Sequence, residues 1–374
     1  MFEQTKDPDV LASESERQDY FAEYLNYAVS TAILEKARVS LSQEPEPLIY
    51  LLRYVDGRCG RAVDFLHRGG IIMINGQKGC RKSTFARALL AIMLNGKLED
   101  CPPTITARLP HLKVAVIDTE QFAPRIYKHA KWLQKNYKGA VPFDERISFY
   151  SVRGYSPQEI LALIAAICEE THPDVLFIDV FSNLVYDINS QEESKRAVDL
   201  IYKICEVYGV AVVGVMHQNP TRDKDKDPGD KMAGALGTQI ERAASCVLNV
   251  TKVPAGVEIV EEKENGDLRG LGYGYNKSSI VTFTALRDRY PDVPTMILTN
   301  ENEKGDLALS IYPAAKEIEG KGIKGDPKKE VWHRVPSRCV SADFQHICER
   351  ELQGKSPEVS FDDTPQDDGE KLAF

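Results

Sequence analysis

The stretch GIIMINGQKGCRKST, residues 70–84, runs from an apolar segment through a glycine-bearing loop into a helical pattern. A strand, a loop and a helix in this order form the context that a phosphate-binding loop requires. The residues follow the pattern G-x-x-x-x-G-K-[ST], with Gly76 first, Lys82 as the lysine and Ser83 as the hydroxyl. One position departs from it, because Arg81 stands where the second glycine belongs. The segment predicts a nucleotide-phosphate site, and a strand–turn–helix that binds no nucleotide is the alternative.

The chemistry of this loop predicts ATP and Mg²⁺ as cofactors. Backbone N–H groups of the loop and of the helix N-terminus bind phosphate oxygens. Lys82 would neutralise the charge of the β- and γ-phosphates, and the Ser83 hydroxyl would bind Mg²⁺. Because Arg81 carries a side chain, we expect a backbone conformation there that a side chain tolerates, with Gly79 giving the loop its freedom. The residues expected around the nucleotide are Gly76, Gln77, Lys78, Gly79, Cys80, Arg81, Lys82, Ser83 and Thr84.

Two further apolar runs end in acids. Residues 174–179 (DVLFID) end in Asp179, which would hold the water shell of Mg²⁺, and residues 114–121 (VAVIDTEQ) carry Asp118 and Glu120. Glu120 would polarise the attacking water, with Asp118 in support. Taken alone, a role in capping the following helix explains either acid of residues 114–121 equally well.

A third run, VVGVMHQNP at 212–220, ends in His217 and Gln218. The carboxyl ends of parallel strands meet at one edge of a sheet, where ligands bind in such folds. These polar residues are therefore expected beside the acids and the phosphate-binding loop. A turn that satisfies its own amides is the alternative.

Apolar runs alternate with helical patterns along the middle of the chain. This alternation predicts an α/β fold with a mostly parallel sheet covered by helices on both faces. The expected strands are 71–74, 114–117, 147–150, 175–178, 210–215 and 247–250, and the expected helices are 83–95, 122–137, 157–169 and 193–206. Later runs at 280–284, 295–298 and 307–311 indicate an antiparallel extension.

Length and composition limit the class of protein. The chain has 374 residues and a net charge of −9, which excludes a basic coat for nucleic acid, so any DNA contact needs a local patch. No apolar run is long enough to cross a membrane, and no secretory signal is seen. The cysteines form no CxxC pair and several lie in apolar runs, which favours buried thiols and a cytoplasmic location. We expect a helical extension (1–44), an ATPase core (45–312) and a linker, short helix and acidic tail (313–374).

The chain resembles the RecA-type P-loop ATPases over about residues 45–300. The likeness rests on the loop at 76–84 and on DTEQ, MHQN and GALGTQIERAASCVLNVTK at 118–121, 216–219 and 234–252. It is most similar to the RepA-type plasmid helicases and to related AAA-family ATPases of bacterial mobile elements, where G-K-x-K-x-R-K-S makes Arg81 expected. The resemblance implies that Glu120 activates water and that Gln218 senses the γ-phosphate.

The resemblance also implies assembly and DNA binding. RecA-type ATPases form rings or filaments in which a neighbouring subunit supplies a cation, so we expect a homo-oligomer, with a hexameric ring as the favoured form. The expected cations are Arg287 and Arg289, with Arg242 as the other candidate. The charge-balanced loop at 219–233 has the position of a DNA loop, and a solvated loop is the alternative. The basic, aromatic segment 122–138 is a second DNA candidate, and a solvated helix face with a buried aromatic stripe is the alternative. The acidic tail, which ends in Phe374, suggests docking on a replication protein.

These observations predict an ATP-hydrolysing motor on single-stranded DNA, in the form of a replicative helicase of a plasmid, phage or mobile element. A recombination mediator that forms filaments is the first alternative. An ATP-dependent switch that binds proteins and no DNA is the second, because the net acidity and the balanced loop fit it.

Overall fold

The computed structural model describes residues 37–39, 41, 46–55, 62–98, 105–109, 111–218, 231–252, 258–262, 268–273, 278–283, 295–300, 309–319 and 329–334. Beyond residue 252 only the backbone is described, except at Val281. The chain divides into two units, Met1–Pro47 and Leu48–Phe374, and every element below lies in the second. The predictions for residues 19–38, 219–230, 284–294 and 341–374 fall wholly or almost wholly outside the described residues.

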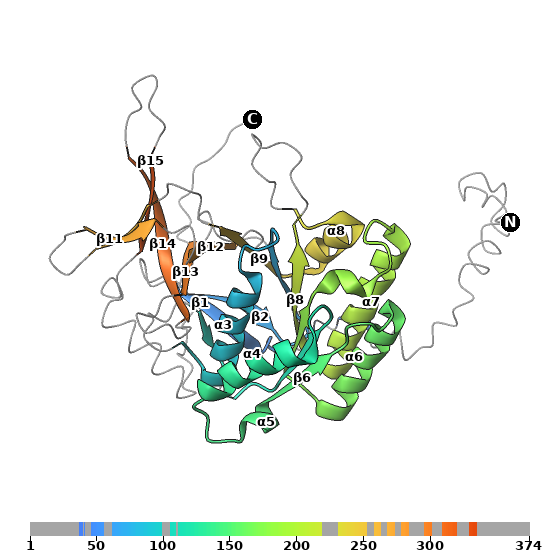
Figure 1. Ribbon diagram of the computed structural model, residues 1–374. Coiled ribbons are helices and arrows are strands. Elements are labelled where there is room, and N and C mark those ends of the chain that lie inside the picture. Colours follow the sequence, from blue (N-terminus) through green and yellow to red (C-terminus); the bar gives the residue numbers. More distant parts are fainter. Residues whose placement is uncertain are drawn as a thin grey trace, which may run out of the picture. The chain divides into compact units, whose positions relative to one another are not determined.

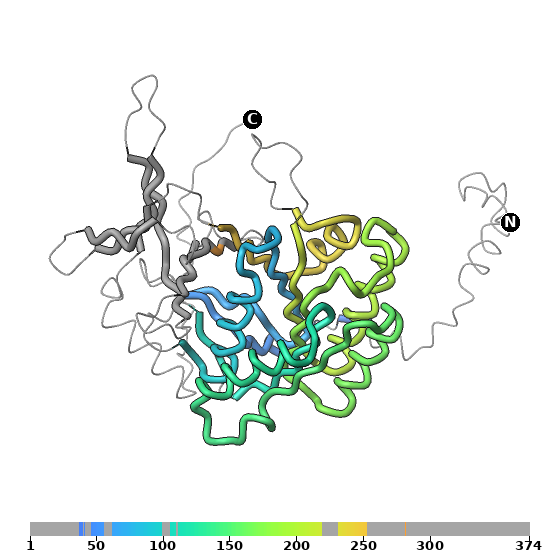
Figure 2. Tube along the Cα trace, viewed as in Figure 1, coloured from blue at the N-terminus to red at the C-terminus, as the bar shows by residue number. Residues whose placement is uncertain are grey.

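A parallel sheet forms the centre of the fold, with the strand order β9-β3-β8-β7-β5-β6. Figure 1 labels β6, β8 and β9 of this sheet, and Figure 2 traces the chain in the same view. Every neighbouring pair in this part of the sheet is parallel. The strands are β3 (Ile71–Gly76), β5 (Val114–Asp118), β6 (Ile147–Ser151), β7 (Val175–Asp179), β8 (Ala211–His217) and β9 (Cys246–Lys252). The predicted parallel sheet is confirmed, and the carboxyl ends of β3, β5, β7 and β8 share one edge.

Helices cover both faces of this sheet, as predicted (Figure 1). The α3 and α4 helices pack on one face, and α6, α7 and α8 pack on the other. Their bounds are α3 (Lys82–Asn95), α4 (Ala123–Lys135), α5 (Phe143–Arg146), α6 (Pro157–Thr171), η2 (Phe181–Leu184), α7 (Gln191–Tyr208) and α8 (Gly234–Ala243). The α6 helix begins with a capping box between Ser156 and Glu159.

Strand alternation explains why both faces need a helical cover. Ile72 and Ile74 of β3 join the core on the α3 side, whereas Ile71 and Met73 join the core on the α6 side. Successive side chains of a strand point to opposite faces, so a run of consecutive apolar residues needs helices on both faces of the sheet to be buried. All residues of β3 are buried.

Further strands extend the sheet beyond β9, which gives 12 strands in the order β11-β10-β15-β14-β13-β12 and then β9 onward. The neighbouring pairs of this extension are antiparallel, except for the parallel pair of β10 and β15. They are β10 (Glu258–Glu262), β11 (Leu268–Tyr273), β12 (Ser278–Phe283), β13 (Thr295–Asn300), β14 (Leu309–Glu319) and β15 (Lys329–Arg334). The extension was predicted. The prediction of a linker from residue 313 is wrong over β14 and β15, which are strands. Lys- and Glu-rich strands lack the apolar run by which strands are recognised.

A separate small sheet, with the order β2-β1-β4, was not predicted. Its strands are β1 (Tyr50–Val55), β2 (Ala62–His67) and β4 (Ile105–Ala107). Leu51, Leu52 and Leu66 bury their side chains in the core that also holds α3. Among the described residues, no helix combines the length and the apolar character needed to cross a lipid bilayer.

Candidate active site

The predicted phosphate-binding loop lies between β3 and α3. Gly76 ends β3 with φ +157, and a side-chain Cβ there would lie 2.3 Å from the backbone oxygen of Val250 in the neighbouring strand β9. No side chain fits at that separation, so the first glycine of the motif is fixed by the close approach of β9. Gln77, Lys78, Gly79 and Ser83 are exposed around the turn. The loop therefore presents its surface to the carboxyl edge of the sheet.

The conformation of Arg81 corrects one prediction. We expected a backbone conformation that a side chain tolerates, but Arg81 has φ 76 and ψ 30, which is left-handed. The residue keeps the conformation that glycine would adopt at this place, because α3 must begin directly at Lys82. A non-glycine residue in this region costs about 1–2 kcal/mol. Burial lowers the pKa of its guanidinium, and its Nη1 is buried without a hydrogen-bond partner among the described residues.

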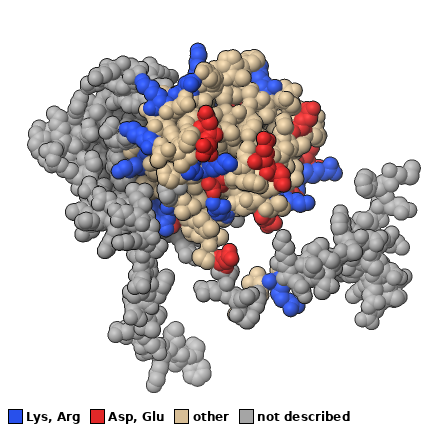
Figure 3. All heavy atoms as spheres, turned by 90° about the horizontal axis from the view of Figure 1, so that it is seen from below, with Lys and Arg blue, Asp and Glu red and all other residues tan. Residues whose placement is uncertain are grey.

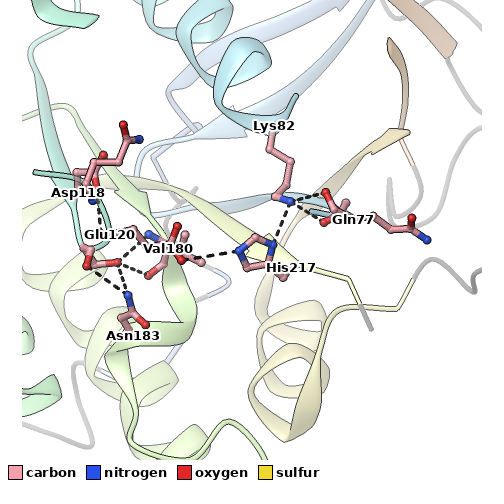
Figure 4. A network of polar contacts seen from close by, with 10 residues as sticks. Gln77, Lys82, Asp118, Glu120, Val180, Asn183 and His217 are labelled. Carbon is pink, nitrogen blue, oxygen red and sulfur yellow. Dashed lines mark hydrogen bonds and ion pairs between the residues drawn. The ribbon is translucent and has the colours of Figure 1, made fainter. Parts of the chain in front are cut away.

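Lys82 turns back over the loop (Figure 4). Its Nζ donates to the backbone oxygens of Gly76, at 2.6 Å, and Gln77, at 2.9 Å, and lies 3.2 Å from Nδ1 of His217. The side chain is buried, and burial lowers the pKa of the ammonium, while the charges of Asp179 and Glu120 oppose that shift. A cation held by two carbonyls at a loop of exposed N–H groups is suited to bind an anion.

His217 connects the lysine to the acid expected to activate water. Its Nε2 lies 3.8 Å from Oε1 of Glu120, an ion-pair distance that is longer than a hydrogen bond (Figure 4). The polar contact with His217 is the main cause that lowers the pKa of Glu120, and the charges of Lys82 and Lys78 add to it. Lys82, His217 and Glu120 thus form one chain of contacts across the carboxyl ends of β3, β8 and β5.

Asp118 shapes the loop that carries Glu120. One carboxylate oxygen, Oδ1, accepts from the backbone N–H groups of Glu120, at 3.0 Å, and Gln121, at 2.7 Å. Asp118 is buried, and burial raises its pKa while the two N–H groups oppose the rise. This is an Asx turn, in which the side chain satisfies its own following backbone. The supporting role expected for Asp118 therefore has a structural basis in the shape of the loop.

Thr119 ties the end of β5 to the end of β7. Its N–H donates to the Asp179 oxygen at 2.7 Å. Its hydroxyl donates to the Val180 oxygen at 3.1 Å and accepts from the Val180 N–H and from Nδ2 of Asn183, both at 2.9 Å. Thr119 is buried, so these bonds are shielded from water. They fix Glu120 relative to Asp179.

Asp179 lies at the acidic end of the site. Burial raises its pKa to about 7, and the nearby charges of Asp118 and Glu120 add to the rise, while Lys82 and His217 oppose it. Three neighbouring carboxyl groups, of which Asp118 is buried, Asp179 half-buried and Glu120 exposed, repel each other when ionised. A divalent cation would relieve that repulsion.

The residues present fit a hydrated Mg²⁺. Ser83, Asp118, Gln121 and Asp179 line part of a cavity of about 40 Å³ between α3 and α4. The Oε1 atom of Gln121 is buried there without a hydrogen-bond partner among the described residues. Hydroxyl and carboxylate oxygens suit Mg²⁺, which keeps several waters. No described group of three His, Cys, Asp or Glu side chains could hold a metal alone, so phosphate oxygens would complete the shell.

The other residues predicted for the site differ in where they lie. The Gln218 N–H donates to the Gly76 oxygen at 3.2 Å, so Gln218 lies at the same edge, and its sensing role stays a prediction. Thr84 is buried on α3, and Cys80 is buried below the loop, where burial raises the pKa of its thiol. Arg242 is exposed in the last turn of α8. Arg287 and Arg289 lie outside the described residues.

Sequence reasoning placed His217 at the correct edge of the sheet, but it missed the contacts of His217 with Lys82 and Glu120 and the bonds of Thr119. A signal for His217 exists, because neighbouring residues of a strand point to opposite faces. Only one of His217 and Gln218 can therefore point toward Lys82 from the end of β8. No local pattern marks Thr119, whose partners lie more than 60 residues away in the sequence.

Comparison with known proteins agrees with this geometry. Residues 59–223 match the family described as the AAA domain. No curated protein matches the sequence. The RadB recombinase structure shares 12% identity, covers 66% of this chain and 92% of its own, and gives a TM-score of 0.40. The structure of a KaiC-like protein from Pyrococcus horikoshii OT3 shares 14% sequence identity with this chain. The match covers 66% of this chain and 91% of that protein, with a TM-score of 0.41. Neither of these likenesses extends to function.

The β3 loop, the parallel sheet and the matched AAA domain define the class of the chain. It has an α/β core with a P-loop at the carboxyl end of β3, and residues 59–223 of it match the AAA domain.

Proposed function

We propose that this chain hydrolyses ATP to drive movement on single-stranded DNA, as a ring-shaped replicative helicase of a plasmid, phage or mobile element. The observation that carries the ATPase part is the chain of contacts from Lys82 through His217 to Glu120, beside the buried Asp118 and the half-buried Asp179. Such a site separates a phosphate-binding cation from a water-activating carboxylate. That separation is what hydrolysis of a terminal phosphate requires.

Each side chain has a distinct part in the proposed reaction. Lys82 leaves the carbonyls of Gly76 and Gln77 and neutralises the β- and γ-phosphate oxygens. Glu120 orients the attacking water, and the low pKa of its carboxyl keeps it ionised at neutral pH. When bound, Mg²⁺ neutralises charge on the phosphates, with Ser83 and Asp179 as its protein contacts. Positioning and electrostatics supply most of the catalysis in this chemistry.

His217 is placed to report which nucleotide is bound. Its ring touches Lys82 on one side and Glu120 on the other. A γ-phosphate that draws Lys82 away from the ring would change the position of His217. His217 ends β8, and the segment from 219 follows it directly. We therefore assign nucleotide sensing to His217 together with Gln218.

Support for DNA and for a ring comes from the resemblance to RepA-type helicases. The loop after β8 has the position of a DNA loop in that family. A neighbouring subunit would complete the site with Arg287, Arg289 or Arg242. The homo-oligomer, the hexameric ring and the replication-protein partner are parts of the same proposal.

The test is ATP hydrolysis by the purified full chain with and without single-stranded DNA, with Lys82→Ala as the blank. Strong stimulation by DNA, followed by unwinding of a forked duplex, supports the proposal. Hydrolysis that ignores DNA would favour a protein-directed switch. Stimulation with strand pairing and no unwinding would favour a recombination mediator.

A further inference from the structure

The segment around α4 is basic. Residues 121–143 contain no Asp or Glu, although the whole chain carries a net charge of −9. The basic residues of this segment are Arg125, Lys128, Lys131, Lys135 and Lys138. Figure 3 shows that basic and acidic side chains both occur on the face of the described residues seen from below. His129 adds no charge at neutral pH, because burial, aided by Arg87 and Arg125, lowers its pKa to about 4.

The basic residues of α4 lie on its outer side. Ile126 and Leu133 are the buried residues of the helix, so the opposite side faces solvent. Trp132 and Tyr137 pack partly on the core, which accounts for two of the aromatic residues in this segment. Tyr127 is different, because it is 61% exposed. Phe122, just before the helix, is 65% exposed.

Each exposed ring has a cation beside it. The Cζ atom of Arg153, at the end of β6, lies 3.7 Å from the centre of the Phe122 ring. Lys131 Nζ lies 5.5 Å from the centre of the Tyr127 ring. In the described part of the chain, no ion pair joins an acid to Arg125, Lys128, Lys131 or Arg153. We call Phe122, Arg125, Tyr127, Lys128, Lys131 and Arg153 the α4 face.

We propose that the α4 face binds single-stranded DNA, with the cations on the phosphates and the two rings under bases. Aromatic rings interleaved with cations are the means by which proteins hold single strands without reading their sequence. Unpaired cations suit a polyanion better than they suit a second copy of this acidic chain. The inference rests on the proposed function and adds a contact surface outside the loop after β8.

The α4 face is joined to the catalytic loop. Phe122 follows Glu120 by two residues, and the Gln121 N–H donates to Asp118. The Gln121 oxygen accepts from the Ser151 hydroxyl at 3.0 Å, close to Arg153 in the chain. A DNA strand that contacts Phe122 and Arg153 would therefore act on the loop that positions Glu120. This link gives DNA a route to stimulate hydrolysis.

The experiment measures binding of a labelled oligothymidylate to the full-length protein at several salt concentrations by fluorescence anisotropy. The basic variant is Lys128→Ala with Lys131→Ala, and its matched control is Lys195→Ala with Lys203→Ala on α7, across the sheet. The aromatic variant is Tyr127→Leu, with Tyr127→Phe as its control. All five substituted sites are exposed, and circular dichroism melting checks the fold.

We expect the basic variant to reduce the slope of log affinity against log salt by about 1.4, because each phosphate contact on a single strand contributes about 0.7. Tyr127→Leu should weaken binding about tenfold, while Tyr127→Phe binds as the wild type does. Both α7 substitutions should leave affinity and slope unchanged.

Several outcomes would overturn the inference. Wild-type affinity and slope in both α4 variants would do so while leaving the proposed function intact, provided that the wild type binds DNA. Loss of self-association with unchanged DNA binding would identify the α4 face as a protein contact. Failure of the wild type to bind any single strand would overturn the proposed DNA function as well.

Discussion

The Nδ1 atom of His217 lies 3.2 Å from the Nζ atom of Lys82. The same ring approaches Glu120 with its other nitrogen, at 3.8 Å. One side chain from β8 therefore joins the phosphate-binding strand β3 to the acid that follows β5. The contacts give His217 a positioning role in hydrolysis, which a pair of substitutions can separate.

His217→Ala should lower kcat for ATP hydrolysis by about 100-fold with little change in ATP binding, because Glu120 loses its neighbour. His217→Asn places an amide near the Nδ1 position, so it keeps the Lys82 contact and loses the Glu120 contact. We expect an intermediate rate for this variant. Steady-state kinetics with a fluorescent-nucleotide binding assay separates the two effects, and a wild-type kcat in His217→Ala would remove His217 from the mechanism.

Thr119→Val should destabilise the protein by about 1–3 kcal/mol, since it leaves the buried Val180 N–H and the Asn183 amide without their partner. Thr119→Ser keeps the hydroxyl and should cost less. Urea denaturation measures both changes. Equal stabilities for the valine and serine variants would show that these bonds contribute little.

Arg81→Gly and Arg81→Ala test the left-handed start of α3. Glycine adopts φ 76 freely and alanine does not, so the glycine variant should be about 1 kcal/mol more stable than the alanine variant. At an ordinary helical position the order is reversed. Thermal melting of the two variants decides the matter, and a more stable alanine variant would contradict the conformation of the loop.

The pH dependence of stability follows from Asp179. Its folded pKa of about 7 lies above the unfolded value of about 3.9, so the folded state holds a proton that the unfolded state has lost. The stabilisation from this proton is complete below pH 4 and disappears as the pH rises through 7.

Without Mg²⁺, this group should cost the protein about 1 kcal/mol of unfolding free energy between pH 6 and pH 8. Asp179→Asn should remove that part of the decline and also the stabilisation by Mg²⁺–ATP. Melting curves at both pH values, with and without Mg²⁺–ATP, measure the two effects. An unchanged pH profile in the variant would place the titration elsewhere.

The sequence predicted the parallel sheet because its strands are buried on both faces and read as long apolar runs. It predicted the phosphate-binding loop because Gly76, Lys82 and Ser83 are close in the chain. The run at 307–311 predicted the start of β14, but neither its continuation to Glu319 nor β15 was predicted, since polar strands lack an apolar run. The left-handed Arg81 was also missed, because a side chain normally argues against that conformation.

Contacts between distant strands were the other gap. His217 meets Lys82 across 135 residues, and only the strand order brings them together. The pattern at the end of β8 held two polar residues, and alternation along the strand allows only one of them to face Lys82. Which of the two does so depends on the register between β3 and β8.

The most direct test of the site is a comparison of Glu120→Gln with the wild type in ATP binding and in single-turnover hydrolysis. The neutral amide keeps the shape of the side chain but cannot accept a proton from water. We predict Mg²⁺–ATP binding within a few-fold of the wild type and hydrolysis at least about 100-fold slower. Hydrolysis at the wild-type rate would contradict the assignment of Glu120 and would mean that another residue activates the water.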